Sequence, residues 1–184
     1  MTAPAITRGA GVLRLLDGVY LGCIWTAGVS IFLMSLIIPW GIFTRYVLGT
    51  GSQWPEPIAI LLMVVFTFIG AAASYRAGAH IAVAVLTDRL PVAARAPLAL
   101  AVQLLMAAIC VFMLVWGTKL CLATWNQTIS ELPWLPVGLT YSPVPLGGLL
   151  TLVFVLERLV LGPQSERAVV RYDAPADELS GEHA

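Results

Sequence analysis

Four long stretches of this chain carry no charged side chain, and each is rich in apolar residues. They are residues 18–44, 57–75, 96–118 and 132–156. About 20 helical residues, each rising 1.5 Å, cross the roughly 30 Å hydrocarbon core of a bilayer. The apolar residues run continuously rather than alternating, which argues against a membrane β-barrel. The sequence therefore predicts an all-α integral membrane protein with four transmembrane helices.

Composition supports the same conclusion. Only 11% of the 184 residues are charged, whereas 59% are hydrophobic. Soluble domains carry about 25% charged residues. A water-soluble fold of this size could not hide so much apolar surface, so membrane lipids must form part of its surroundings. The net charge of zero argues against a nucleic-acid partner.

Charged and helix-breaking residues divide the chain into parts. We predict a short N-terminal segment at 1–14, a membrane domain at 15–161 and a disordered tail at 162–184. The predicted transmembrane helices cover about 18–44, 57–76, 96–119 and 137–159. This organisation leaves no room for a separate soluble domain.

Two segments do not follow the simple pattern of a straight transmembrane helix. Residues 80–90 are too short to span a membrane and place their polar residues on one face, which predicts a short interfacial helix. Pro143 and Pro145 complicate the fourth span, because proline breaks or kinks a helix interior. The fourth helix therefore starts either near Val137 with a kink or near Pro145.

The basic residues are distributed unevenly between the two sides of the predicted membrane. Eight of the ten lie before the first helix, between the second and third helices, or after the fourth helix. Only Arg45 and Lys119 fall on the other side. Because basic residues accumulate in cytoplasmic loops, both termini are predicted to be cytoplasmic.

Polar and small residues gather around the second apolar run. Gly70 and Gly78, with Ser74 between them, give a face on which another helix can approach closely. The candidates for contact with a partner subunit or with lipid are Arg45, Trp54, Glu56, Gly70, Arg76, Gly78 and His80.

Each of these candidates has more than one interpretation. Arg45 and Glu56 flank one turn and can pair with each other or with a partner; an exposed pair is worth only about 0–1 kcal/mol. Trp54 fits either an aromatic belt at the membrane border or a subunit interface. Arg76 fits a border anchor that contacts lipid phosphate or a partner. His80 either forms a hydrogen bond at the start of the interfacial helix or acts as a pH sensor.

The apolar runs contain no charged residue, and an intramembrane charge is the usual marker of an ion or substrate path. Walker motifs and protease-type sets such as HExxH are absent from the sequence, and the three cysteines form no CxxC pair. We therefore expect no catalytic, cofactor-binding or metal site and no enzymatic activity. The chain has the character of a partner subunit rather than of a complete transporter.

Short motifs between residues 45 and 91 carry a family resemblance. They are Arg45-Tyr46-Val47, Trp54-x-Glu56, Gly70-Ala71-Ala72, Arg76-x-Gly78-x-His80-Ile81-x-Val83 and Asp88-Arg89-Leu90-Pro91. Over roughly residues 15–160 the chain resembles the small membrane subunit, of DctQ type, of tripartite ATP-independent periplasmic (TRAP) transporters. Pro57 departs from the pattern, because the family often has a second acidic residue there.

The resemblance implies a function, partners and a location in the inner membrane of a bacterium or archaeon. A large TRAP permease subunit would carry the sodium and substrate sites and move substrate by an elevator-like motion. A periplasmic substrate-binding protein would deliver an organic acid, and the small subunit would enlarge the fixed scaffold without any cofactor. The alternative is a membrane anchor or assembly subunit of another inner-membrane complex, for example a respiratory one.

Overall fold

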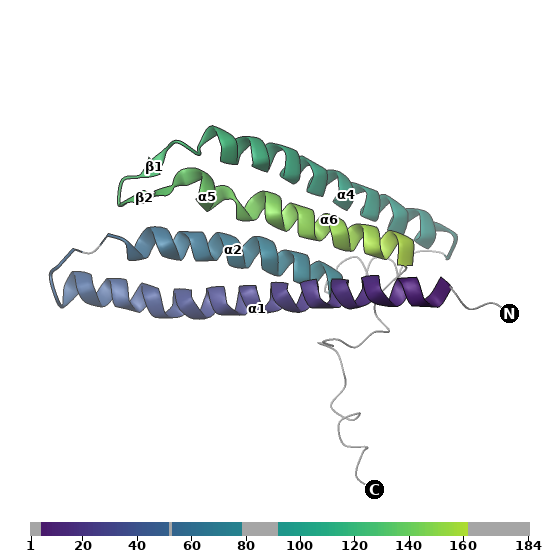
Figure 1. The fold of residues 1–184 in the computed structure, drawn as a ribbon, viewed down its shortest axis with the longest axis horizontal. Helices are drawn as coiled ribbons and strands as arrows, with labels where there is room; N and C mark the ends of the chain where they lie inside the picture. The colour runs from purple at the N-terminus through teal and green to yellow at the C-terminus, as the bar shows by residue number, and fades with distance from the viewer. Residues whose placement is uncertain (1–4, 52, 79–91, 162–184) are drawn as a thin grey trace, which may run out of the picture.

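The computed structural model describes residues 5–51, 53–78 and 92–161, and this part of the chain is mostly helical (Figure 1). Its helices and strands are α1 (Ala5–Tyr46), α2 (Pro55–Arg76), α4 (Val92–Ala123), β1 (Thr128–Ile129), β2 (Leu132–Pro136), α5 (Val137–Tyr141) and α6 (Pro143–Leu161). Within the described residues, four helical segments are long and apolar enough to cross a membrane: Gly11–Tyr46, Pro55–Arg76, Pro97–Ala123 and Val137–Val160. The predicted all-α fold with four spans is confirmed.

The first helix is longer than the apolar run that predicted it. The sequence placed its start near residue 18, whereas α1 begins at Ala5. No proline lies between Thr7 and Asp17, so nothing forces the helix to stop at the border of the apolar run, and it continues into a charged segment. The predicted interfacial helix at 80–90, including His80, and the predicted tail at 162–184 lie outside the described residues.

The fourth span starts at Val137 and is interrupted once. Helix α5 ends at Tyr141. The next residue, Ser142, keeps helical angles (φ −59°, ψ −29°), and its N–H donates to the Leu139 carbonyl oxygen at 3.1 Å. Helix α6 then begins at Pro143, a position where the missing proline N–H costs nothing. Of the two predicted starts, the interrupted helix from Val137 is the observed one.

A short hairpin connects α4 to α5. Its strands β1 and β2 pair antiparallel, with Ile129 opposite Leu132. The Val137 N–H donates to the Gln127 carbonyl oxygen at 2.8 Å and fixes the hairpin to the start of α5. Leu132 and Leu135 are buried, so the hairpin has a packed face. The sequence had indicated only a loop here.

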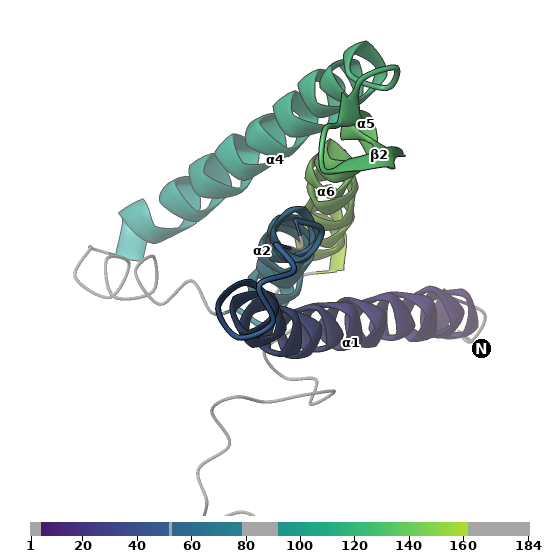
Figure 2. The same ribbon diagram turned by 90° about the vertical axis from the view of Figure 1, so that its left-hand side faces the viewer.

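The long helices form a single layer in the order α1, α2, α6, α4 (Figures 1 and 2). Helix α2 packs between α1 and α6, and α6 packs between α2 and α4. We call the end with the α1–α2 turn, β1 and β2 the hairpin end, and the end with the start of α1 and the last residues of α2 and α6 the terminal end. The single layer leaves large side chains such as Trp25 and Phe112 exposed, which suits contact with lipid or a partner.

Two adjacent glycines let α6 lie between its neighbours. A Cβ on Gly147 would lie 2.7 Å from the Cβ of Phe68 on α2, and one on Gly148 would lie 3.2 Å from the Cβ of Met113 on α4. Successive helical residues point about 100° apart. Together they bring α6 close to α2 on one side and to α4 on the other, as small residues do in membrane helices.

The buried core lies nearer the terminal end. Its fully packed members come from α1, α2 and α6 and are Tyr20, Cys23, Ala72, Ala73, Tyr75, Phe154 and Val155. Three of these residues, Tyr20, Tyr75 and Phe154, adjoin the last residue of α2, Arg76, so the core contributes to the surroundings of that charge.

Candidate functional site

Arg76, the last residue of α2, is held by carboxylates from two other helices. Its Nε donates to Glu157 Oε2 at 2.8 Å and its Nη2 donates to Glu157 Oε1 at 2.8 Å. The same Nη2 donates to Asp17 Oδ1 at 2.6 Å. The side chains of Arg76 and Glu157 are 6% and 1% exposed, and that of Asp17 is 29% exposed. Helices α1, α2 and α6 therefore meet at one guanidinium group.

Aromatic rings complete the surroundings of this guanidinium. Its Cζ lies 5.1 Å from the ring centroid of Tyr20 and 5.4 Å from that of Phe154. Tyr20 follows Asp17 by three residues on α1, and Phe154 precedes Glu157 by three on α6, so each helix presents one ring and one carboxylate on the same face. We call these five residues the Arg76 cluster. Arg76 thus combines charge-assisted hydrogen bonds with cation–π contacts.

The charged groups of the Arg76 cluster form ion pairs with one another within the chain. A two-pronged arginine–carboxylate pair offsets the desolvation of both groups only when its geometry is good and its hydrogen bonds are made, as they are here. The cluster therefore joins three helices at the terminal end. The sequence suggested a lipid or partner contact for Arg76, which stays a prediction; the carboxylate partners within the chain were missed. The available signal was that Asp17 and Glu157 are the charges that border two apolar runs at this same end.

Gly78 and Gly70 have local structural roles on or beside α2. Gly78 has φ +76°, a left-handed conformation that suits glycine, and its N–H donates to the Tyr75 carbonyl oxygen at 3.2 Å. It therefore ends α2 directly after Arg76. A Cβ on Gly70 would lie 3.7 Å from the Cβ of Ala27, so Gly70 faces α1.

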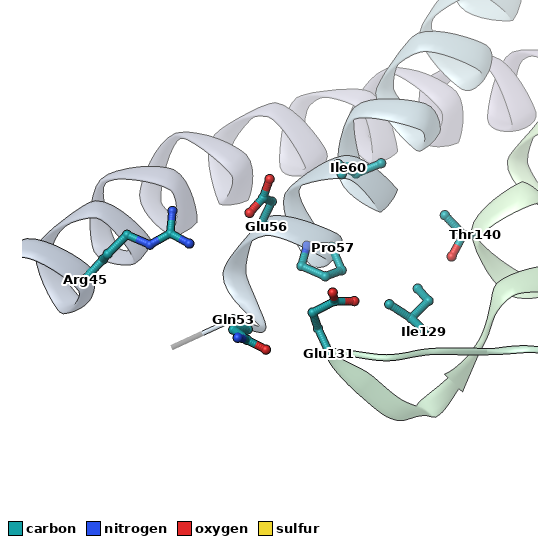
Figure 3. A pocket seen from close by; sticks show the side chains of 8 residues that line it. All are labelled: Arg45, Gln53, Glu56, Pro57, Ile60, Ile129, Glu131 and Thr140. Carbon is teal, nitrogen blue, oxygen red and sulfur yellow. The ribbon is translucent and has the colours of Figure 1, made fainter. Parts of the chain in front are cut away.

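At the hairpin end, the α1–α2 turn and the hairpin enclose a hollow of about 380 Å³ (Figure 3). It is lined by Arg45, Gln53, Glu56, Pro57, Ile60, Ile129, Glu131 and Thr140, which we call the hairpin-end hollow. The structure thus brings the predicted residues Arg45 and Glu56 to one site. Trp54 is 39% exposed and does not line it.

The charged side chains that line the hairpin-end hollow form no ion pair with one another or with other described residues. Arg45, Glu56 and Glu131 are exposed, and none has an ion-pair partner within 4.0 Å among the described residues. Glu131 could not be singled out from the sequence, because its place in the hollow depends on the hairpin. Pro57, which stands where a second acidic residue was expected, lines the hollow, and Glu131 brings a second carboxylate to it.

Local sequence explains the first wall of the hollow. Gly49 and Gly51 have φ of +62° and +58°, which reverses the chain after α1. Pro55 then starts α2 and packs against α1, where a Cβ on Gly41 would lie 3.0 Å from the Pro55 Cβ. This contact places Glu56, in the first turn of α2, beside the end of α1.

Several hydroxyl groups in the described spans donate to carbonyl oxygens of their own helix. Thr26 donates to the Gly22 carbonyl oxygen at 2.7 Å, and Thr67 donates to the Met63 carbonyl oxygen at 2.7 Å. Among the described residues, the buried side-chain oxygens without a hydrogen-bond partner are Gln103 Oε1 and Thr140 Oγ1. The second of these lines the hairpin-end hollow.

Comparison with known proteins identifies similar chains. Residues 34–163 match the family described as tripartite ATP-independent periplasmic transporters, DctQ component. A TRAP transporter small permease protein of Haemophilus influenzae is 27% identical over 128 residues, covering 70% of this chain and 79% of the relative. The sialic acid TRAP transporter small permease protein SiaQ of Vibrio cholerae is 27% identical over 143 residues, covering 73% of this chain and 80% of the relative.

Proposed function

This chain belongs to the DctQ component of the tripartite ATP-independent periplasmic transporters, and on that premise we propose that it is a scaffold partner of a large, elevator-type permease subunit. The complex would take up an organic acid, driven by sodium and supplied by a binding protein. The chain would be a multi-pass inner-membrane protein with both termini in the cytoplasm. The observation that carries this proposal is the Arg76 cluster.

The Arg76 cluster supports a fixed rather than a moving role. Sliding α2 relative to α1 or α6 would break hydrogen bonds of 2.6 and 2.8 Å and leave buried charges without partners. Breaking a buried pair in this way costs about 3–5 kcal/mol. The cluster therefore favours a rigid unit of α1, α2 and α6 against which another subunit can move.

The exposed surface supports a membrane partner. The single layer leaves apolar side chains uncovered on many of its helices, among them Phe32 (63% exposed) and Leu105 (62% exposed). Such surface is at home against lipid or against another membrane protein. We propose that part of it binds the large subunit.

The substrate class rests on the relatives. One of them is named for sialic acid, which carries a carboxylate. We extend the carboxylate, and not the particular compound, to the complex of this chain. The sodium and substrate sites would lie in the large subunit, because the apolar runs of this chain hold no charged residue.

Reconstitution into liposomes tests the proposal. This chain alone should give no sodium-driven uptake of an organic acid, whereas the chain with the large subunit and the binding protein should give uptake that depends on all three. Uptake by this chain alone would overturn the scaffold role. Uptake by the large subunit and binding protein at the full rate without this chain would also contradict it.

A further inference from the structure

One nitrogen of the Arg76 guanidinium, Nη1, donates no hydrogen bond to any described residue. The other two nitrogens do: Nε and Nη2 donate to the two oxygens of Glu157, and Nη2 also donates to Asp17 Oδ1. A guanidinium is planar and presents its N–H groups in a fixed fork. Since Glu157 takes the Nη2 hydrogen on the Nε side, Asp17 takes the one on the Nη1 side. Nη1 therefore lies directly beside the Asp17 carboxylate.

This edge of the Arg76 cluster is open. Among the described residues, Nη1 is not one of the fully buried side-chain atoms that lack a hydrogen-bond partner, so it keeps some accessible surface. The side chain of Asp17 is 29% exposed, and no described residue donates to its Oδ2. A Cβ on Gly18, the residue after Asp17, or on Gly78 would meet no atom within 4 Å. The chain is thus bare next to both charges.

The open edge lies at the level of lipid headgroups. Asp17, Arg76 and Glu157 each stand directly next to an uncharged apolar run. Such a run fills the hydrocarbon core of the bilayer, and the charged residues at its ends lie at the border with the headgroups. Three separate runs therefore agree in placing the cluster at this border. The placement holds whichever side of the membrane this end faces.

The charges of the Arg76 cluster select the chemistry of a ligand. Two carboxylates and one guanidinium leave the cluster with one negative charge in excess, which disfavours a purely anionic headgroup. The open edge nevertheless offers N–H donors at Nη1 beside a carboxylate acceptor on Asp17. A ligand that fits both must join an anionic acceptor to a cationic N–H donor. A phosphate linked through two carbons to a primary ammonium has this form.

We propose that the open edge of the Arg76 cluster binds the headgroup of an ethanolamine phospholipid. The phosphate accepts a hydrogen bond from Arg76 Nη1, and the ammonium donates to Asp17 Oδ2. The bound headgroup bridges α2 and α1, which carry these two residues. This inference depends neither on the proposed function nor on the orientation in the membrane.

The same chemistry favours a lipid over a protein segment. A polypeptide would have to bring an acidic and a basic side chain together at one edge, whereas a single ethanolamine headgroup carries both charges and occupies this level of the bilayer. Choline lipids lack an N–H on their cation, and glycerol lipids lack a cation. Both therefore serve as matched probes that differ from the ethanolamine lipid in the headgroup alone.

The test measures lipid binding to the purified full-length chain in detergent by native mass spectrometry. Ethanolamine, choline and glycerol phospholipids with identical acyl chains are compared. The ethanolamine lipid should bind about tenfold more tightly than either of the others, as expected for a charge-assisted hydrogen bond that only it can make. Equal affinities for the three lipids, or tightest binding of the anionic glycerol lipid, would overturn the proposal without any need for a variant.

A matched pair of variants on α1 locates the binding. Asp17→Asn should reduce the affinity for the ethanolamine lipid to that for the choline lipid. Arg14→Gln removes an exposed charge one turn earlier, outside the cluster, and should keep the full preference. The opposite pattern would mean that lipids are attracted to the basic end in general, and the site would be wrong. Melting temperatures measured without added lipid show whether either variant has lost its fold.

A protein occupant is the remaining outcome. The lipid comparison is repeated on the complex of this chain with the large subunit. The preference for the ethanolamine lipid should persist there. If it is present in the chain alone and lost in the complex, the edge is a contact between subunits, and the lipid site is overturned while the proposed function stands.

The proposed function fails separately, in the liposome experiment described above. A lipid preference that depends on Asp17 would stand even if the chain proved to have no role in transport.

Discussion

The two ends of this membrane protein differ in whether their notable charged side chains are buried and paired or exposed and unpaired among the described residues. At the terminal end, Arg76 and Glu157 are nearly inaccessible and lie within hydrogen-bond distance of each other. At the hairpin end, Arg45, Glu56 and Glu131 are exposed and have no ion-pair partner among the described residues. Each end borders the same apolar layer, so the difference lies in how the helices and the hairpin meet there.

This difference separates groups that hold the chain together from groups that remain available. A buried charge must be paired within the fold, because an unpaired one is costly. An exposed charge keeps its water and contributes little to stability. The charges of the Arg76 cluster therefore serve the fold, and the exposed charges at the hairpin end can serve a partner.

The largest expected effect concerns the side of the membrane on which each end lies. In a cysteine-free background, Asn126→Cys at the hairpin end should react fully with a membrane-impermeant maleimide added to intact cells. Ala77→Cys at the terminal end should react only after the cells are opened, because basic residues favour the cytoplasmic side. The reverse labelling pattern would contradict the predicted orientation.

A matched pair of substitutions tests the comparison energetically. Glu157→Ala should lower the unfolding free energy by about 3 kcal/mol, the lower part of the usual range for a broken buried pair, because Asp17 remains beside Arg76. Glu131→Ala should change it by less than about 0.5 kcal/mol, as exposed positions do. Denaturation of the purified protein in detergent measures both. Equal effects would show that the two ends do not differ as described.

The smallest effect distinguishes the two carboxylates of the Arg76 cluster. Asp17→Asn should cost about 1 kcal/mol, because Asp17 is 29% exposed and accepts one hydrogen bond, whereas Glu157 is 1% exposed and accepts two. The same denaturation series reports it. A cost for Asp17→Asn as large as that for Glu157→Ala would mean that α1 is held as firmly as α6.

The apolar runs determined the membrane class and the number of spans, because insertion depends on the length and hydrophobicity of each segment by itself. Short motifs between residues 45 and 91 also identified the family, which the match over 34–163 confirms. The sequence also indicated Arg45, Glu56 and Arg76 as candidates for contact with a partner or with lipid, because each borders an apolar run. These are local properties, and they survive without knowledge of how the helices pack.

Helix packing decided what those residues do. Arg76 meets partners 59 and 81 residues away in the sequence, and Glu131 reaches the hollow only because the hairpin is fixed to α5. Helix order in the layer depends on close contacts at Gly147 and Gly148, which no periodicity reveals. Pairing a charge requires two helices to meet in one register, and that register is set by the packing of the whole layer. The sequence therefore located the charges at the two ends, while only the tertiary structure decided which are paired and which are free.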